Sequence, residues 1–182
     1  MSAPHPETFP RRPAEGFVRA VGAISLFCGW IAAALTVIAL FVTCQMIFVR
    51  YALGRSTIWQ TEAVIYLMIA ATMLGLPYVQ RLRGHVNVDL VPMMLGPGAR
   101  RGLAWAVLLA TIAVAALLSW YSFDVWHQAW ARNWKSSTVW APPLWIPYLA
   151  LPVGFGLFLL QLVADMIALA TRAQPPFGIA EG

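Results

Sequence analysis

The chain has 182 residues, of which 60% are hydrophobic and only 10% charged, and its mean hydropathy is +0.71. A water-soluble domain carries about 25% charged residues, so this chain cannot cover a soluble surface and lipid must be its outer solvent. The net charge of +5 does not indicate nucleic-acid binding, because no segment is long and polar enough to form a basic stripe. An ordinary soluble enzyme and a nucleic-acid-binding protein are therefore excluded.

The chain begins with a polar, proline-rich segment and continues into a long apolar run. Residues 1–19 contain four prolines and three arginines and predict a cytoplasmic tail that ends in an amphipathic lead-in. Residues 20–49 contain no charge, and as a helix they would extend about 45 Å, beyond a hydrocarbon thickness of roughly 30 Å. This run is too long for a cleaved signal peptide and predicts a first membrane span.

Three further spans follow. We predict the second at residues 59–80, with Trp59 as an interfacial anchor and Pro77 in its last turn. The third is predicted at residues 102–123, and the fourth at 146–169, where Pro152 can kink the helix. We therefore expect an all-α integral membrane protein with four transmembrane helices in one membrane domain, residues 20–172, followed by a cytoplasmic tail, residues 173–182.

The basic residues predict the orientation of these spans. Four spans place both termini on the same side of the membrane. If that side is the cytoplasm, eight basic residues lie on inner segments and four on outer loops, which the positive-inside rule favours. The inner residues are Arg11, Arg12, Arg19, Arg81, Arg83, Arg100, Arg101 and Arg172, and the outer ones are Arg50, Arg55, Arg132 and Lys135.

The outer connection after the third span is rich in tryptophan. Trp126, Trp130 and Trp134 recur at i, i+4 and i+8, which predicts a short helix at the membrane surface with all three side chains on one face. An aromatic belt at the interface is the simpler interpretation. The alternative is a docking surface for an external protein, to which Arg132 and Lys135 would contribute charge.

Residues that could hold a cofactor or a metal are sparse. The three histidines, His5, His85 and His127, lie outside the predicted spans, so no pair can ligate a haem within the bundle. His85 and Asp89 stand at i and i+4, but a third metal ligand is not apparent, and structural pairing or capping is favoured. The sequence therefore predicts no cofactor, no metal site and no enzyme.

The spans also lack the intramembrane ionisable residues that mark a transport pathway, because Glu62 and Asp165 fall at predicted helix ends. We interpret Glu62 as a first-turn carboxylate of the second helix, stabilised by the helix dipole and by Arg55 or Arg50. Small residues at helical spacing predict close packing, within the bundle or against a larger partner. They are Ser25, Gly29 and Ala33; Ala71 and Gly75; and Gly102, Ala106 and Ala110.

A longer pattern runs from the first outer loop through the second span. It comprises Arg50-Tyr51, Gly54-Arg55-Ser56, Trp59-Gln60-Thr61-Glu62, Tyr66, Gly75, Arg81 and Gly84-His85-Val86-Asn87-Val88-Asp89. In this order, and inside a four-span chain, the pattern resembles the small membrane subunit of tripartite ATP-independent periplasmic (TRAP) transporters.

The resemblance implies a multi-pass protein of the bacterial inner membrane that belongs to a three-part, sodium-driven symporter. A periplasmic binding protein would capture an organic anion, a carboxylate or a sugar acid, and a large multi-span subunit would move it. The small subunit would act as a structural brace. Its motif residues would fix the fold and the contact with the large subunit rather than bind substrate: Arg50, Arg55, Trp59, Glu62, Gly75, Arg81, His85 and Asp89.

Three further hypotheses stay open at this stage. The basic residues of the outer loops and the tryptophan stripe would help to dock the binding protein. A stand-alone, dimeric four-span transporter would use Glu62, provided that this carboxylate faced a cavity inside the bilayer. A small integral membrane enzyme would need polar groups that converge at one depth, but the spans contain no pair of nucleophile and base.

Overall fold

The structure is a computed structural model that describes residues 13–82 and 96–171. The described residues form helices α1 (Pro13–Ala52), α2 (Ile58–Arg81), α4 (Pro97–Ala131), α5 (Trp145–Tyr148) and α6 (Ala150–Ala170). Among them, four stretches are long and apolar enough to cross a membrane, with α5 and α6 together forming the fourth. The predicted all-α, four-span fold is confirmed, and the protein is a multi-pass membrane protein.

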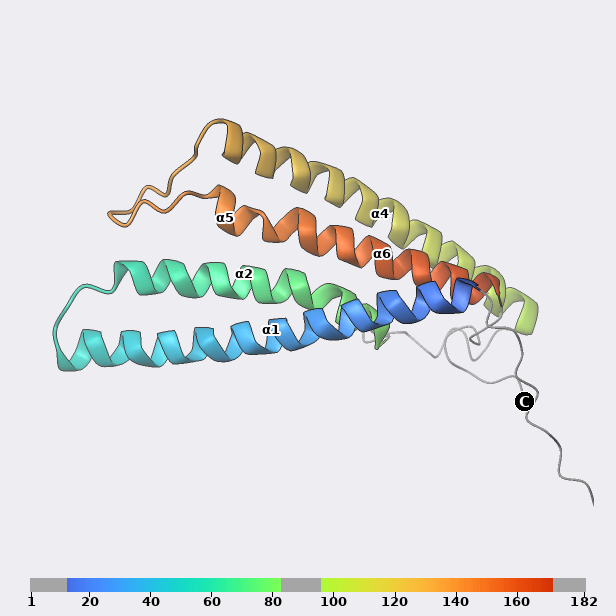
Figure 1. The fold of residues 1–182 in the computed structure, drawn as a ribbon, viewed down its shortest axis with the longest axis horizontal. Helices are drawn as coiled ribbons and strands as arrows, with labels where there is room; N and C mark the ends of the chain where they lie inside the picture. Colours follow the sequence, from blue (N-terminus) through green and yellow to red (C-terminus); the bar gives the residue numbers. More distant parts are fainter. Residues whose placement is uncertain (1–12, 83–95, 172–182) are drawn as a thin grey trace, which may run out of the picture.

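The helices form two antiparallel pairs that run between two ends of the bundle (Figure 1). We call the end with the α1–α2 turn and the α4–α5 connection the loop end, and the opposite end the terminal end. Helix α6 is central: it packs against α1, α2 and α4. In the fourth span, formed by α5 and α6, a third of the most apolar stretch is buried, against 6% in α4, which packs chiefly on α6. Most of the surface of α4 is therefore open to lipid or to a partner.

Two helices are longer than the sequence predicts. Helix α1 begins at Pro13, a residue favoured at the first helical position, and its 40 residues extend about 60 Å, so that part of the predicted tail is helical. Helix α4 continues to Ala131, so Trp126 and Trp130 lie on this long helix. The prediction of a separate short surface helix was wrong, because nothing breaks the helix before Asn133, which has φ 47°.

A proline and a glycine bring α2 and α6 together. Pro77 has no N–H, so the carbonyl of Met73 receives no hydrogen bond from the residue four positions ahead. Gly154 of α6 lies against this carbonyl, and a Cβ at Gly154 would stand 2.7 Å from Met73 O. The proline thus frees an acceptor at the point where the glycine permits close backbone approach.

The fourth span is interrupted near its start. The hydrogen-bond pattern of the helix is interrupted between α5 and α6, although Leu149, which joins them, keeps helical angles of φ −58° and ψ −30°. Pro152 explains this interruption, because it cannot donate to the carbonyl of Tyr148 and its ring crowds that carbonyl. The backbone at this point stays helical, and the kink expected from Pro152 remains a prediction.

Candidate functional site

The connection between α4 and α5, residues 132–144, folds back on itself and is called the strap. Its two arms pair through the amide of Ser136 on Pro142 O at 3.1 Å and the amide of Leu144 on Trp134 O at 2.8 Å. A tight turn is closed by the amide of Ala141 on Thr138 O at 3.0 Å, and Ala141 has φ 44°. These bonds give the strap a defined shape, with residue 139 at its tip.

Glu62 fastens the strap to α2. Its carboxylate is buried, with 9% of the residue exposed, and its Oε1 accepts a short hydrogen bond from the hydroxyl of Ser136. Its Oε2 is also buried and has no hydrogen-bond partner among the described residues. The carboxylate therefore acts as an anchor for the strap and keeps one oxygen able to accept a further bond.

Other polar and aromatic side chains surround this anchor. The Tyr66 side chain lies near Ser136, Glu62 and Tyr148, so residues of α2, α5 and the strap meet here. At the same end, the ring of Trp140 on the strap meets that of Trp59 edge-on, with centroids 6.4 Å apart. The strap is thus held to α2 by one polar and one aromatic contact.

The interpretation of Glu62 from sequence was wrong in two respects. Helix α2 begins at Ile58, so Glu62 is its fifth residue and lies beyond the first turn, where the helix dipole acts most strongly. One carboxylate oxygen of Glu62 accepts a hydrogen bond from Ser136, and the other has no partner among the described residues. Neither oxygen is therefore paired with Arg50 or Arg55, which are both exposed to the exterior. Sequence reasoning missed Ser136, whose distance of 74 residues along the chain leaves no local signal.

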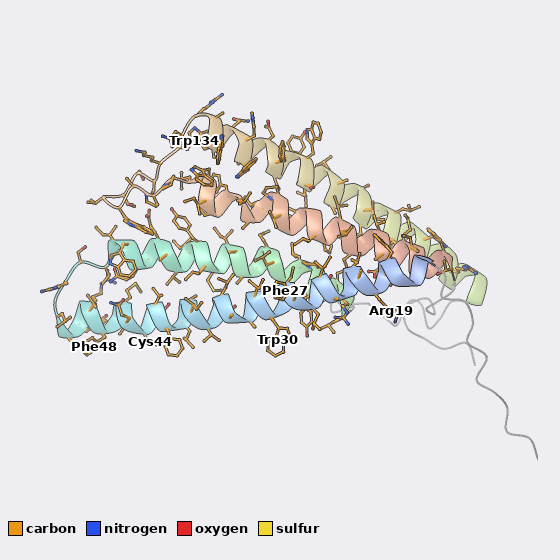
Figure 2. All side chains as sticks on the ribbon, viewed as in Figure 1. Arg19, Phe27, Trp30, Cys44, Phe48 and Trp134 are labelled. Carbon is orange, nitrogen blue, oxygen red and sulfur yellow. The ribbon has the colours of Figure 1, made fainter. Side chains whose placement is uncertain are left out.

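The tryptophan stripe contributes to an aromatic cluster. Trp126 meets Phe123 and Trp130 with ring centroids 5.6 and 6.0 Å apart, and Trp130 meets Trp145 of α5 at 4.7 Å. Trp134 leaves this row, because α4 ends at Ala131 and Trp134 belongs to the strap (Figure 2). The cluster therefore packs α4 against the start of the fourth span.

A second polar cluster, which we call the terminal network, lies between three helices near the terminal end. Ser25 of α1 donates to Gln161 Oε1 at 2.7 Å, and both side chains are buried. Asp165 accepts from Gln161 Nε2 through Oδ1 and from Gln80 Nε2 through Oδ2, each at 2.9 Å. Asp165 precedes the end of α6 by more than one turn. Its placement at a helix end was therefore wrong, and the i, i+4 spacing of Gln161 and Asp165 was the missed signal.

The small residues of the first two spans serve packing inside the bundle. A Cβ at Gly29 would overlap the ring of Tyr78 at 2.6 Å, and Gly75 lies in ordinary contact with Ala32. The stripe on α4 behaves differently, since Gly102, Ala106 and Ala110 are all exposed. Ser25, Gly29, Ala71 and Gly75 are therefore used by the chain itself, whereas Ala33 is exposed like the three residues of the α4 stripe.

The remaining motif residues lie at both ends. Arg81 at the terminal end is exposed and passes over Gly22 of α1, where a Cβ would lie 3.5 Å from its Nε. Arg132 and Lys135 are exposed on the strap. His85 and Asp89 lie outside the described residues. Within residues 13–82 and 96–171, no three His, Cys, Asp or Glu side chains are grouped so as to hold a metal ion.

Comparison with known proteins identifies relatives of the chain. Residues 38–172 match the family model of tripartite ATP-independent periplasmic transporters, DctQ component. The chain is 24% identical over 136 residues to the C4-dicarboxylate TRAP transporter small permease protein DctQ of Pseudomonas aeruginosa, a match that covers 71% of this chain and 62% of the relative. It is 26% identical over 114 residues to the isethionate TRAP transporter permease protein DctMQ of Oleidesulfovibrio alaskensis, covering 62% of this chain and 18% of that protein.

These matches span less than two thirds of the length of either relative. No solved structure matches the chain. The family model nevertheless covers most of the sequence, including all of α2, α4, α5 and α6. The chain belongs to the DctQ component family of the tripartite ATP-independent periplasmic transporters.

Proposed function

We propose that the chain is the small permease subunit of a sodium-driven uptake system for organic anions, and that it braces the large membrane subunit. The observation that carries this proposal is the family match over residues 38–172. The DctMQ relative supports a large partner, because this chain matches only 18% of it and a much longer region shares that polypeptide. The names of both relatives support an anionic substrate, as dicarboxylates and isethionate are organic acids.

The packing of the bundle suits a stationary brace. The terminal network and the close approaches at Gly29 and Gly154 hold α1, α2 and α6 in one arrangement. A substrate-carrying domain that moves through the membrane needs such a fixed neighbour. We therefore assign the rigid part of the brace to α1, α2 and α6.

The contact with the large subunit is proposed on α4. Gly102, Ala106 and Ala110 lie on one face of this helix, and all three are exposed. Small side chains let two membrane helices approach closely, which drives association in lipid where the hydrophobic effect does not. The open face of α4 thus supports a contact between helices of the two subunits.

Purification of the tagged chain with its membrane partners tests the brace. We expect a large multi-span subunit to copurify, Ala106→Trp to abolish copurification, and Ala116→Trp to preserve it, since Ala116 is exposed about 80° around the same helix. Deletion of the chain should stop uptake and destabilise the large subunit. A homodimer without a larger partner would contradict the brace and favour a stand-alone transporter that uses Glu62.

We further propose that the chain lies in the bacterial inner membrane with its terminal end in the cytoplasm. The eight-to-four distribution of basic residues supports this orientation. In intact cells, a membrane-impermeant maleimide should then label a cysteine at Ser137 on the strap but not one at Thr171. Labelling with the opposite preference would reverse the orientation.

The loop end is proposed to attract the periplasmic binding protein through charge. Arg50, Arg55, Arg132 and Lys135 are exposed there, and charges of one sign on a surface steer an oppositely charged partner. The hypothesis from sequence also included Trp126, Trp130 and Trp134, of which the first two now contribute to the aromatic cluster. Charge reversal at the four basic residues should weaken association most strongly at low salt. An unchanged salt dependence would contradict this role.

A further inference from the structure

The tip of the strap exposes an apolar side chain in an otherwise well-anchored loop. Val139 is 90% exposed, although its neighbour Trp140 turns towards Trp59 and is only 46% exposed. Three residues before the tip, Ser136 is bonded to the buried Glu62. The chain therefore holds both sides of the tip in place and leaves Val139 projecting.

The backbone of the strap is ordered and locally strained. Thr138 donates its amide to Ser136 Oγ at 3.4 Å, and Ala141 closes the turn on Thr138 O. Ala141 adopts φ 44°, in the left-handed region where a side chain is disfavoured, and such strain persists only where surrounding contacts determine the conformation. The α1–α2 turn at the same end places Gly54 at its positive φ instead and needs no such constraint. The strap thus has the character of a shaped, preorganised element.

We propose that the strap tip is a preformed docking knob, in which Val139 enters an apolar pocket on the water-soluble substrate-binding protein. This inference rests on the proposed function, which supplies such a partner at the loop end. The exposed Arg132 and Lys135 on the arms of the strap fit a pocket with an acidic rim. A buried apolar anchor with a charged rim is the usual plan of a specific interface.

The residue types at the tip favour a protein pocket over lipid. A loop that inserts into the membrane interface commonly presents tryptophan or another large aromatic at its most exposed position. Here the most exposed residue is a compact β-branched valine, and the tryptophan beside it packs on Trp59. A stiff side chain on a held backbone loses little conformational entropy on binding, which raises affinity.

The test measures binding of the purified substrate-binding protein to the complex of this chain with its large subunit in lipid nanodiscs. Val139→Ala should raise Kd about tenfold, from the loss of two buried methyl groups, and Val139→Asp should raise it further. The matched control for Val139→Ala is Leu53→Ala, because Leu53 is an apolar residue, 56% exposed, in the neighbouring α1–α2 turn, and this substitution leaves the charge of the turn unchanged. It should leave Kd within about twofold, well below the tenfold change that one lost anchor produces.

The dependence of binding affinity on salt concentration distinguishes the contribution of Val139 from that of the basic residues on the arms of the strap. The Val139→Ala variant should keep the wild-type slope of affinity against ionic strength, whereas Lys135→Glu should change that slope. Wild-type affinity in both Val139 variants would overturn the docking knob. If the large subunit copurifies in that case, only this inference fails; if no large subunit copurifies, the proposed function fails as well.

A second measurement detects insertion of the tip into lipid. A fluorophore on Ser137→Cys, an exposed position two residues before Val139, leaves the valine intact and should be quenched by iodide in the absence of the binding protein and protected when it binds. Quenching by nitroxide-labelled lipid, with or without the binding protein, would show that the tip is a membrane anchor and would overturn the proposal.

Discussion

Each end of the bundle places a carboxylate between its elements, buried at Glu62 and half-buried at Asp165, but the two are used differently. At the terminal end, both oxygens of Asp165 accept hydrogen bonds from side-chain amides of α2 and α6. At the loop end, one oxygen of Glu62 accepts a hydrogen bond from a hydroxyl of the strap, and the other has no hydrogen-bond partner among the described residues. Asp165 thus joins helices to one another, whereas Glu62 holds a loop.

The separation of the helices explains this difference. Near the terminal end, Ser25 of α1 reaches Gln161 of α6, so polar side chains of three helices can satisfy one another. Towards the loop end, α1 and α4 lie apart, and a connecting segment supplies the missing donor (Figure 1). We infer that the terminal end fixes the bundle and the loop end presents a surface.

The largest expected effect comes from the close contact of α2 with α6, which lies between the two ends of the bundle. Gly154→Ala would place a methyl group 2.7 Å from Met73 O, so α6 must move away from α2, and we expect a loss of about 2–3 kcal/mol of stability. Unfolding in a titration of denaturing detergent measures this loss. Gly156→Ala is the control, because a Cβ there meets nothing within 4 Å. Equal stability of the two variants would contradict close packing at Gly154.

Removal of the Asp165 carboxylate from the terminal network should have the next largest effect. Asp165→Ala leaves the amides of Gln80 and Gln161 without this acceptor, which we expect to lower stability by about 2 kcal/mol. Asp124→Ala removes an exposed carboxylate whose hydrogen bond is to Gln128 on the same helix, and it should change stability by less than about 0.5 kcal/mol. If both variants unfold together, the terminal network does not hold the bundle.

The anchor of the strap should matter less for global stability than for local opening. Ser136→Ala removes the hydroxyl bonded to Glu62, and we expect a loss of about 1 kcal/mol together with faster hydrogen exchange in residues 132–144. Ser137→Ala, next to it and exposed, should change neither quantity. Fast exchange that spreads along α2 and α6 would show that the loop end also fixes the bundle.

The smallest effect is a gain. Ala141→Gly relieves the left-handed strain at φ 44° and should raise stability by at most about 1 kcal/mol, because the added freedom of glycine in the unfolded chain offsets part of the relief. Slower hydrogen exchange at Thr138 and Ser136 would report a tighter strap. A clear loss of stability would show that the methyl group of Ala141 makes a contact that outweighs the strain.

Much of the fold could be predicted from local sequence. Four apolar runs, Pro77 and Pro152 indicate the spans and their irregular points, and the order of residues around Trp59 and Glu62 indicates the family. The length of α4 was underestimated, because its polar and aromatic last turns suggested a new element. Two distant partners, Ser136 of Glu62 and Gln80 of Asp165, were also missed, since hydrogen bonds across 74 and 85 residues leave no spacing to detect.

The sequence by itself determined the class of solvent, the number of spans and the positions of the residues that interrupt helices, because each depends on hydropathy or on backbone chemistry within a few residues. Tertiary structure decided which polar groups are paired, which small residues are already used and which apolar residue projects. These properties depend on how helices distant in sequence pack, so the pairing of Glu62 with Ser136 and the exposure of Val139 were determined by the folded bundle.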